Sequence, residues 1–227
     1  MAKRNVLFLH HSTGGNVVNG GLNPLIDAWN AKHGDTIQFV WPWSIPSGNY
    51  AHDWASDTFL PGRLEIYAGA YDLVIWKQCY PGSHILADLG AADPLSPRKS
   101  LENYKALYRI IRDRLDGFAN TRFMAWTLPP LHRLAGEKDP AERAACAARA
   151  SEFSRWMRQE WLSEGGTSHP NQCVFDFRGL VVGPDHYLRE EYEIDHQKTD
   201  SHPNEAANKA AAPKFFEAIV QALGLKN

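Results

Sequence analysis

Three residue types that can cooperate in acyl transfer stand near the two ends of this chain. Ser12 lies in a His-His-Ser-Thr-Gly-Gly segment after an apolar run, and Asp200 and His202 lie in Asp-Ser-His-Pro near the C-terminus. A serine hydroxyl is a poor nucleophile near neutral pH until an imidazole removes its proton, and that imidazole works best when a carboxylate orients it. We therefore predict Ser12 as a nucleophile, His202 as its base and Asp200 as the acid that orients His202.

Acyl transfer also needs hydrogen-bond donors for the negative oxygen of the tetrahedral intermediate, each of which contributes roughly 3 kcal/mol. Gly48 lies in Ser-Gly-Asn after a second apolar run, and Gln78 lies in Lys-Gln-Cys after a third. The backbone amides of Ser12 and Gly48 and the side chain of Gln78 are therefore our candidates for oxyanion and substrate binding.

The elements that must position these residues can be read from five short apolar runs. Such runs are typical of parallel strands that are buried on both faces. They cover residues 6–9, 36–41, 71–76, 122–127 and 173–177. Helices are expected from Asn23, from about Ser100, from Asp139 and from Asn204, and Pro213 is expected to kink or break the last one.

Strands that alternate with helices predict an α/β fold, a three-layer α/β/α sandwich with a parallel sheet of about five strands. A chain of 227 residues is ordinary for one domain, so we expect a single domain over residues 1–227. Ligands of such sheets bind beyond the carboxyl ends of the strands, which is where the candidate residues lie.

Composition excludes several classes of function. The net charge is −2 and no long basic run occurs, so nucleic-acid binding is not expected. No apolar stretch is long enough for a signal peptide or a membrane span, and we expect a cytoplasmic protein that acts on a small-molecule or saccharide ester. Cys79, Cys146 and Cys173 are odd in number and far apart, so they are interpreted as buried apolar residues rather than as disulfides or zinc ligands.

The four polar segments resemble the four conserved blocks of the SGNH (GDSL-like) hydrolases. The segment Trp76-Lys77-Gln78-Cys79-Tyr80 is most similar to the Trp-x-Gln-Gly-Glu motif of the sialate O-acetylesterase-like branch. This resemblance implies a flavodoxin-like fold, a serine esterase mechanism that uses no metal or other cofactor, and acetylated carbohydrates as substrates.

The sequence departs from that family at three places. The Gly-Asp-Ser-Leu signature is absent around Ser12, Gln78 stands where most members carry Asn, and the usual Asp-x-x-His is shortened by one residue at Asp200. The shorter spacing changes the direction of the carboxylate relative to the imidazole. Asp195 is therefore a second candidate for the orienting acid, and a Ser-His dyad without an acid is a third possibility.

Two other functions are compatible with the sequence. A non-catalytic glycan-binding module would use the aromatic residues that follow the second apolar run, which are Trp41, Trp43, Tyr50 and Trp54. A metal-dependent hydrolase would use His10 and His11 with an acid such as Asp53, Asp185 or Asp195. The metal hypothesis is the weaker one, because adjacent residues at a strand end point to opposite faces and no HExxH motif occurs.

Overall fold

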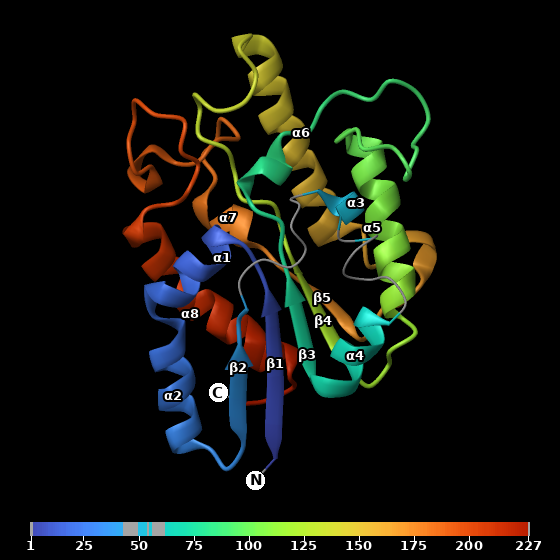
Figure 1. Cartoon of the computed structure of the whole chain (residues 1–227). Helices are drawn as coiled ribbons and strands as arrows, with labels where there is room; N and C mark the ends of the chain where they lie inside the picture. The colour runs from blue at the N-terminus through green and yellow to red at the C-terminus, as the bar shows by residue number, and fades with distance from the viewer. Residues whose placement is uncertain (1, 43–49, 54, 56–61, 227) are drawn as a thin grey trace.

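Five parallel strands form a single sheet in the order β2-β1-β3-β4-β5, as the computed structural model of the chain shows (Figure 1). The structure describes residues 2–42, 50–53, 55 and 62–226. The strands are β1 (Lys3–Leu9), β2 (Thr36–Val40), β3 (Leu73–Trp76), β4 (Arg122–Trp126) and β5 (Gln172–Phe175). Because all five run in the same direction, their carboxyl ends meet at one edge of the sheet.

Helices cover both faces of the sheet, which confirms the predicted three-layer α/β/α sandwich. One face carries α1 (Ser12–Val17), α2 (Asn23–Lys32), α7 (Phe177–Val181) and α8 (Glu205–Ala222). The other carries α3 (Ala51–Asp53), α4 (Arg63–Ala70), α5 (Leu101–Leu115) and α6 (Pro140–Gln159). A π-helical turn (Val18–Leu22) links α1 to α2, and short 3-10 turns cover Tyr80–Ser83, Glu164–Gly166 and Glu190–Tyr192.

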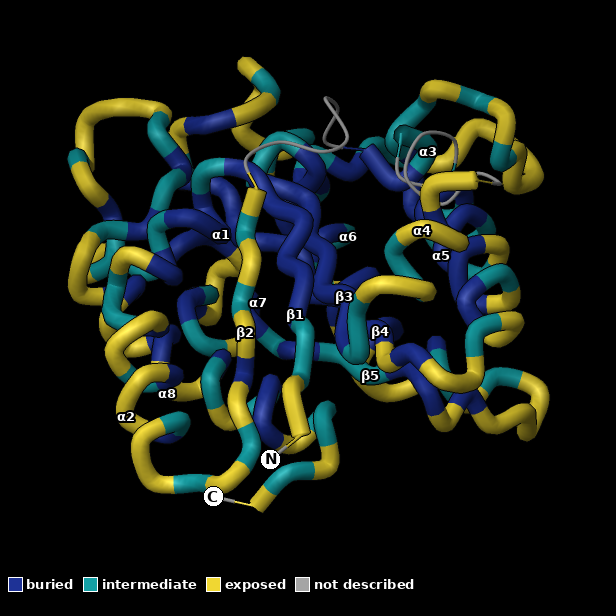
Figure 2. Tube along the Cα trace, turned by 60° about the horizontal axis from the view of Figure 1, so that its bottom comes forward, coloured by how far each residue is buried: buried dark blue, intermediate teal, exposed yellow. Residues whose placement is uncertain are grey.

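The two cores on either side of the sheet follow the alternation of side chains along each strand. Val6 and Phe8 of β1 belong to the core under α8, and Leu7 and Leu9 belong to the core under α5 and α6. The central strand β3 is buried along its whole length, whereas the edge strand β2 has exposed positions (Figure 2). The sheet thus provides a rigid base for the loops at its carboxyl edge.

Several of the described elements differ from the expectation. The segment that begins at Ser12 is a short helix that packs against α8, although its Gly-rich sequence has no helical apolar period. The helices Ala51–Asp53, Arg63–Ala70 and Phe177–Val181 were not predicted. Helix α8 passes through Pro213 without ending there, so the expected break does not occur.

Among the residues that the structure describes, no helix combines the length and apolarity that crossing a bilayer requires.

Candidate active site

Ser12 is the first residue of α1, just beyond the carboxyl end of β1 (Figure 1). The chain can turn this sharply because Gly14 has no side chain, since a Cβ there would lie 2.6 Å from the Cβ of His10. His10 is fully buried, and its ring nitrogens lie 2.9 and 3.2 Å from the carbonyl oxygens of His11 and Trp41. The turn therefore rests on a packed base while Ser12 itself stays partly exposed.

The loop before α8 brings His202 to Ser12 from the other end of the chain. The Nε2 atom of His202 lies 2.6 Å from the Oγ atom of Ser12, across 190 residues of sequence. On the opposite side of the ring, Nδ1 lies 2.6 Å from Oδ1 of Asp200. The structure thus brings three of the predicted site residues into one hydrogen-bonded chain.

The shortened Asp-x-His spacing produces this geometry through a tight turn. The same Oδ1 atom of Asp200 also accepts a hydrogen bond of 3.0 Å from the backbone N–H of His202. A carboxylate that accepts from the backbone two residues on forms an Asx turn, and here the turn places it beside the ring of that residue. Asp195 instead contacts Lys198, at 2.8 Å, and the backbone N–H of Gln197, so it does not reach His202.

The carboxylate determines which ring nitrogen of neutral His202 carries the proton. An ionised carboxylate only accepts hydrogen bonds, so Nδ1 must donate to Asp200. The lone pair of Nε2 is then directed at the hydroxyl of Ser12, which donates to it. This is the arrangement in which an imidazole can remove a serine proton.

The charges around His202 favour its protonated form. A hydrogen bond to Cys79 raises the pKa of His202, burial lowers it, and Asp200 raises it again, so it lies above the usual imidazole value. Burial raises the pKa of Asp200, but the hydrogen bonds from the backbone and ring of His202 outweigh this and hold it below its usual value. Both shifts stabilise an imidazolium next to a carboxylate, the pair that forms when the serine proton moves to His202.

Buried polar contacts attach the loop that carries Asp200 and His202 to the loop after β4. The Oγ atom of Ser201, which is fully buried, accepts a hydrogen bond of 2.9 Å from the backbone N–H of His132. The ring of His132 in turn lies 3.2 Å from the carboxylate of Glu193, and both side chains are almost completely buried. These contacts fix the position of the short segment between the acid and the base.

Gln78 does not point toward Ser12, in contrast to its predicted role as an oxyanion donor. Its amide N–H donates to the hydroxyl of Tyr108 at 2.9 Å, and its carbonyl oxygen accepts from Tyr104 at 3.3 Å. Successive side chains along a strand point to opposite faces of the sheet. Gln78 lies two residues after Trp76, so both side chains face the core under α5. The predicted contribution of Gly48 falls outside the described residues.

Cys79 is buried, as we interpreted it, and it is also part of the site. Its Sγ atom lies 3.3 Å from Oγ of Ser12 and 3.0 Å from Oγ1 of Thr13. The signal that could have revealed it is the spacing of two between Lys77 and Cys79, which places both on the sheet face opposite to Gln78. All three cysteines are free thiols.

The residues of the two alternative functions have structural partners. The ring of His10 stacks on Trp41, and the buried Tyr50 packs against Tyr104 and donates its hydroxyl hydrogen to the carbonyl of Arg98. Trp43 and Trp54 lie outside the described residues. Within the part of the chain that is described, no group of three or more His, Cys, Asp or Glu side chains is placed to bind a metal ion.

Comparison with known proteins supports the fold assignment. No protein-family model matches the chain, and no curated protein matches it in sequence. Among solved structures, an acetyl xylan esterase is 16% identical, with 95% of this chain and 99% of that chain covered and a TM-score of 0.55. An alpha/beta hydrolase enzyme from the metagenome of Lake Arreo, Spain, is 16% identical over 100% and 96% of the two chains, with a TM-score of 0.54. An acetyl-xylooligosaccharide esterase from Geobacillus is 15% identical over 100% and 97%, with a TM-score of 0.50.

This chain has the fold of the SGNH-like hydrolases. Identities this low establish the fold and leave the activity to be argued from the site.

A hollow of about 590 Å³ is lined by residues that adjoin the site along the chain. Its lining includes Pro203, which directly follows His202, and Asn16, which lies one helical turn beyond Ser12 on α1. Asn204, the N-cap of α8, and Asn208, in the first turn of α8, also line the hollow. Backbone groups of the protein engage the amide of Asn204 and the amide N–H of Asn208, so Asn16 and Asn19 are the side-chain amides that this hollow offers to a ligand.

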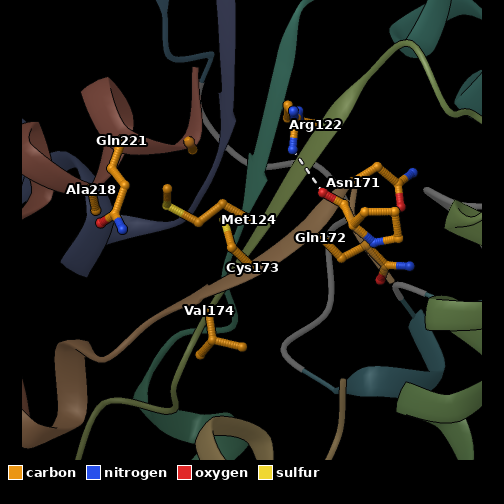
Figure 3. A pocket seen from close by; sticks show the side chains of 10 residues that line it. Arg122, Met124, Asn171, Gln172, Cys173, Val174, Ala218 and Gln221 are labelled. Atoms are coloured by element: carbon orange, nitrogen blue, oxygen red, sulfur yellow. Dashed lines mark hydrogen bonds between the residues drawn. The ribbon is translucent and has the colours of Figure 1, made fainter. Parts of the chain in front are cut away.

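A second cavity, of about 350 Å³, lies at the opposite end of the sheet (Figure 3). It is lined by Arg122 at the start of β4, by Gln172 and Cys173 at the start of β5, and by Gln221 near the end of α8. Because ligands of parallel sheets bind at the carboxyl ends of the strands, this cavity is not the candidate site.

We predict that Ser201→Ala lowers the free energy of unfolding by about 1–3 kcal/mol, because the buried N–H of His132 loses its acceptor. Urea denaturation of the two proteins measures the difference. Ser163→Ala is the control, since Ser163 makes only exposed contacts and its loss should change stability by less than about 0.5 kcal/mol. Equal stabilities of wild type and Ser201→Ala would show that this contact does not anchor the loop.

Proposed function

We propose that this protein is a serine esterase in which Ser12 is the nucleophile. The observation that carries the proposal is the continuous hydrogen-bonded chain from Ser12 through His202 to Asp200, with both side-chain contacts at 2.6 Å. Side chains that lie 190 residues apart meet here at the edge of the sheet where ligands bind. A series of hydrogen bonds from serine through histidine to aspartate activates the serine for acyl transfer. A purely structural role would not require all three residue types.

In the proposed reaction, the Oγ atom of Ser12 attacks the carbonyl carbon of an ester while Nε2 of His202 takes the hydroxyl proton. The imidazolium then gives this proton to the departing alkoxide, and an acyl group remains on Ser12. Water, deprotonated by His202, releases the acid and restores the serine. Asp200 keeps its charge throughout and stabilises the imidazolium.

The proposed oxyanion donor among the described residues is the backbone N–H of Ser12. The first amides of a helix have no intrahelical acceptor, and Ser12 begins α1. Such a donor contributes about 3 kcal/mol to the stability of the intermediate when it is directed at the oxyanion. Gly48 stays a predicted donor, whereas the contacts of Gln78 with Tyr104 and Tyr108 argue against it.

The proposed substrate is an acetyl ester on a carbohydrate. Two structural neighbours are named as esterases of acetylated xylan or xylo-oligosaccharides, and the resemblance of the Trp76-Lys77-Gln78 segment to the sialate O-acetylesterase-like branch agrees with this class. The hollow next to Pro203 agrees with a polar ligand, because its lining includes the side-chain amides of Asn16 and Asn19, and sugar hydroxyls need both donors and acceptors.

The first test is turnover by wild type and Ser12→Ala. We expect wild type to hydrolyse p-nitrophenyl acetate and to release acetate from acetylated xylo-oligosaccharides, and Ser12→Ala to lose at least about 1,000-fold in kcat. Saccharide binding without turnover in both proteins would favour the glycan-binding module. Turnover that survives Ser12→Ala and is abolished by a chelator would favour a metal-dependent hydrolase.

A matched pair of variants tests the role of Asp200. We expect Asp200→Asn to lower kcat at least about 100-fold, because an amide no longer enforces the proton on Nδ1 of His202. Asp195→Asn should keep the wild-type rate, since Asp195 contacts Lys198 instead. If Asp195→Asn were the impaired variant, the assignment would be reversed, and full activity in both would indicate a Ser-His dyad.

A further inference from the structure

The segment that carries the proposed acid and base, residues 193–202, has two buried polar side chains, and both contact His132. Residues 194 and 196–199 of this segment are exposed, whereas Glu193 and Ser201 are buried. The hydroxyl of Ser201 accepts a hydrogen bond of 2.9 Å from the backbone N–H of His132. The carboxylate of Glu193 lies 3.2 Å from the ring of the same residue. A largely exposed segment is therefore attached to the protein interior at two points on one residue.

His132 belongs to a part of the chain that is itself firmly held. Residues 127–132, which follow β4, are all buried. Pro129 and Pro130 fix two backbone φ angles in this stretch, and the carbonyl of Pro129 accepts a hydrogen bond from the hydroxyl of Ser83. His132 is thus a fixed reference point to which a more exposed segment can be attached.

The ring of His132 can direct only one hydrogen at Glu193. The backbone N–H of Leu134 donates to Nδ1 of His132 at 3.0 Å, so Nδ1 is an acceptor and carries no hydrogen. The hydrogen of the neutral ring is therefore on Nε2, the atom that lies 3.2 Å from Oε2 of Glu193. An N–H beside a carboxylate oxygen is an attractive contact, and the low dielectric of the interior strengthens it.

The carboxylate of Glu193 is buried, and its partners keep it ionised. Its side chain is only 1% exposed, and buried charges are unfavourable unless they are paired. The Nε atom of Arg133 donates to Oε1 at 3.2 Å, and Nδ1 of His196 lies 2.7 Å from Oε2. Burial raises the pKa of Glu193, but the contacts with His196, His132 and Arg133 outweigh burial and hold the pKa below its usual value. Glu193 therefore presents a fixed negative charge to the ring of His132.

We propose that Glu193 is a positioning residue for the acid and base of the site. Its carboxylate holds the ring of His132, and His132 holds Ser201, the residue between Asp200 and His202. This inference rests on the proposed function for its kinetic consequence. The contact between Asp200 and His202 is a property of the folded chain and is independent of any substrate.

The geometry that Glu193 supports is sensitive to small displacements. Asp200 and His202 contact each other at 2.6 Å, and the segment between them has no other buried polar side chain than Ser201. Without the contact between Glu193 and His132, the bond to Ser201 is the one anchor of this kind that remains in the segment. A displacement of about 1 Å at a reacting group can lower a rate about 100-fold, so loss of one anchor should be measurable.

The experiment compares Glu193→Gln, His132→Asn and the double variant with wild type. Glu193→Gln keeps the shape of the side chain and removes its charge. His132→Asn keeps the backbone N–H that bonds to Ser201 and removes the ring nitrogen that faces Glu193. Glu191→Gln is the matched control, because Glu191 is exposed and undergoes the same chemical change two residues earlier. Circular dichroism confirms that each variant is folded, and either single variant suffices for the test.

NMR titration of His202 is the first measurement. A carboxylate beside an imidazole raises its pKa, so the difference in the His202 pKa between wild type and Asp200→Asn measures the contact between acid and base. We expect Glu193→Gln and His132→Asn each to lose at least about half of this difference. The double variant should lose no more than either single variant, since both changes break one contact. Glu191→Gln should titrate as wild type.

Steady-state kinetics with p-nitrophenyl acetate is the second measurement. We expect kcat to fall about 10-fold or more in Glu193→Gln and His132→Asn, with KM within about twofold of wild type, because the lost contact lies behind the acid and base. A raised KM with unchanged kcat would overturn the proposal. So would a His202 titration that is the same in wild type and Glu193→Gln, or losses that add in the double variant.

These outcomes can be separated from failure of the proposed function, because the titration needs no turnover. If wild type is inactive but Glu193→Gln changes the titration of His202, the esterase proposal fails and the positioning role stands. If Ser12-dependent turnover is present and Glu193→Gln behaves as wild type, the esterase proposal stands and the positioning role fails.

Discussion

The site depends on one imidazole ring that is held from both sides. The nitrogens of His202 each lie 2.6 Å from a partner, Asp200 on one side and Ser12 on the other. A ring constrained in this way has one orientation and, in its neutral form, one tautomer. The surrounding structure can be understood as the support for these two contacts. The sheet positions Ser12, the Asx turn positions Asp200, and the buried bond between Ser201 and His132 holds the loop that joins acid to base.

Much of this arrangement could be predicted from the sequence because parallel strands impose a simple rule. Apolar runs that end in polar segments identify the strands, and the carboxyl ends of parallel strands lie together, so Ser12 could be placed near a ligand site. His202 and Asp200 could be predicted from their chemistry, although the direction of the carboxylate could not. That direction depends on a turn in which Asp200 bonds to the backbone of His202, and sequence spacing alone does not distinguish it from Asp195.

Two features of the site could not be predicted, for different physical reasons. The orientation of Gln78 is decided by which face of the sheet its position reaches, and the tyrosines on α5 that accept and donate to it lie about 30 residues away. The contact of Cys79 with Ser12 and Thr13 depends on how the segment after β3 packs against α1. Only the packed structure shows that Lys77 is enclosed and that the thiol of Cys79 lies against the nucleophile.

The fold and the site make separate contributions to the functional argument. Identities of 15–16% to the solved structures show shared architecture, and many activities can be built on one architecture. The argument for an esterase therefore rests on the Ser12–His202–Asp200 geometry. Cys79 adds a feature that neither the fold nor the sequence resemblance implies, because it places an ionisable sulfur against the nucleophile.

Activation of Ser12 by His202 is the central claim, and covalent labelling tests it most directly. Wild type and His202→Ala are treated with a fluorophosphonate, which reacts with activated serines, and the site of the adduct is located by mass spectrometry of the digested protein. The account predicts one adduct, on Ser12, in wild type and none in His202→Ala. An unlabelled wild type, an adduct on a different residue, or equal labelling of both proteins would contradict it.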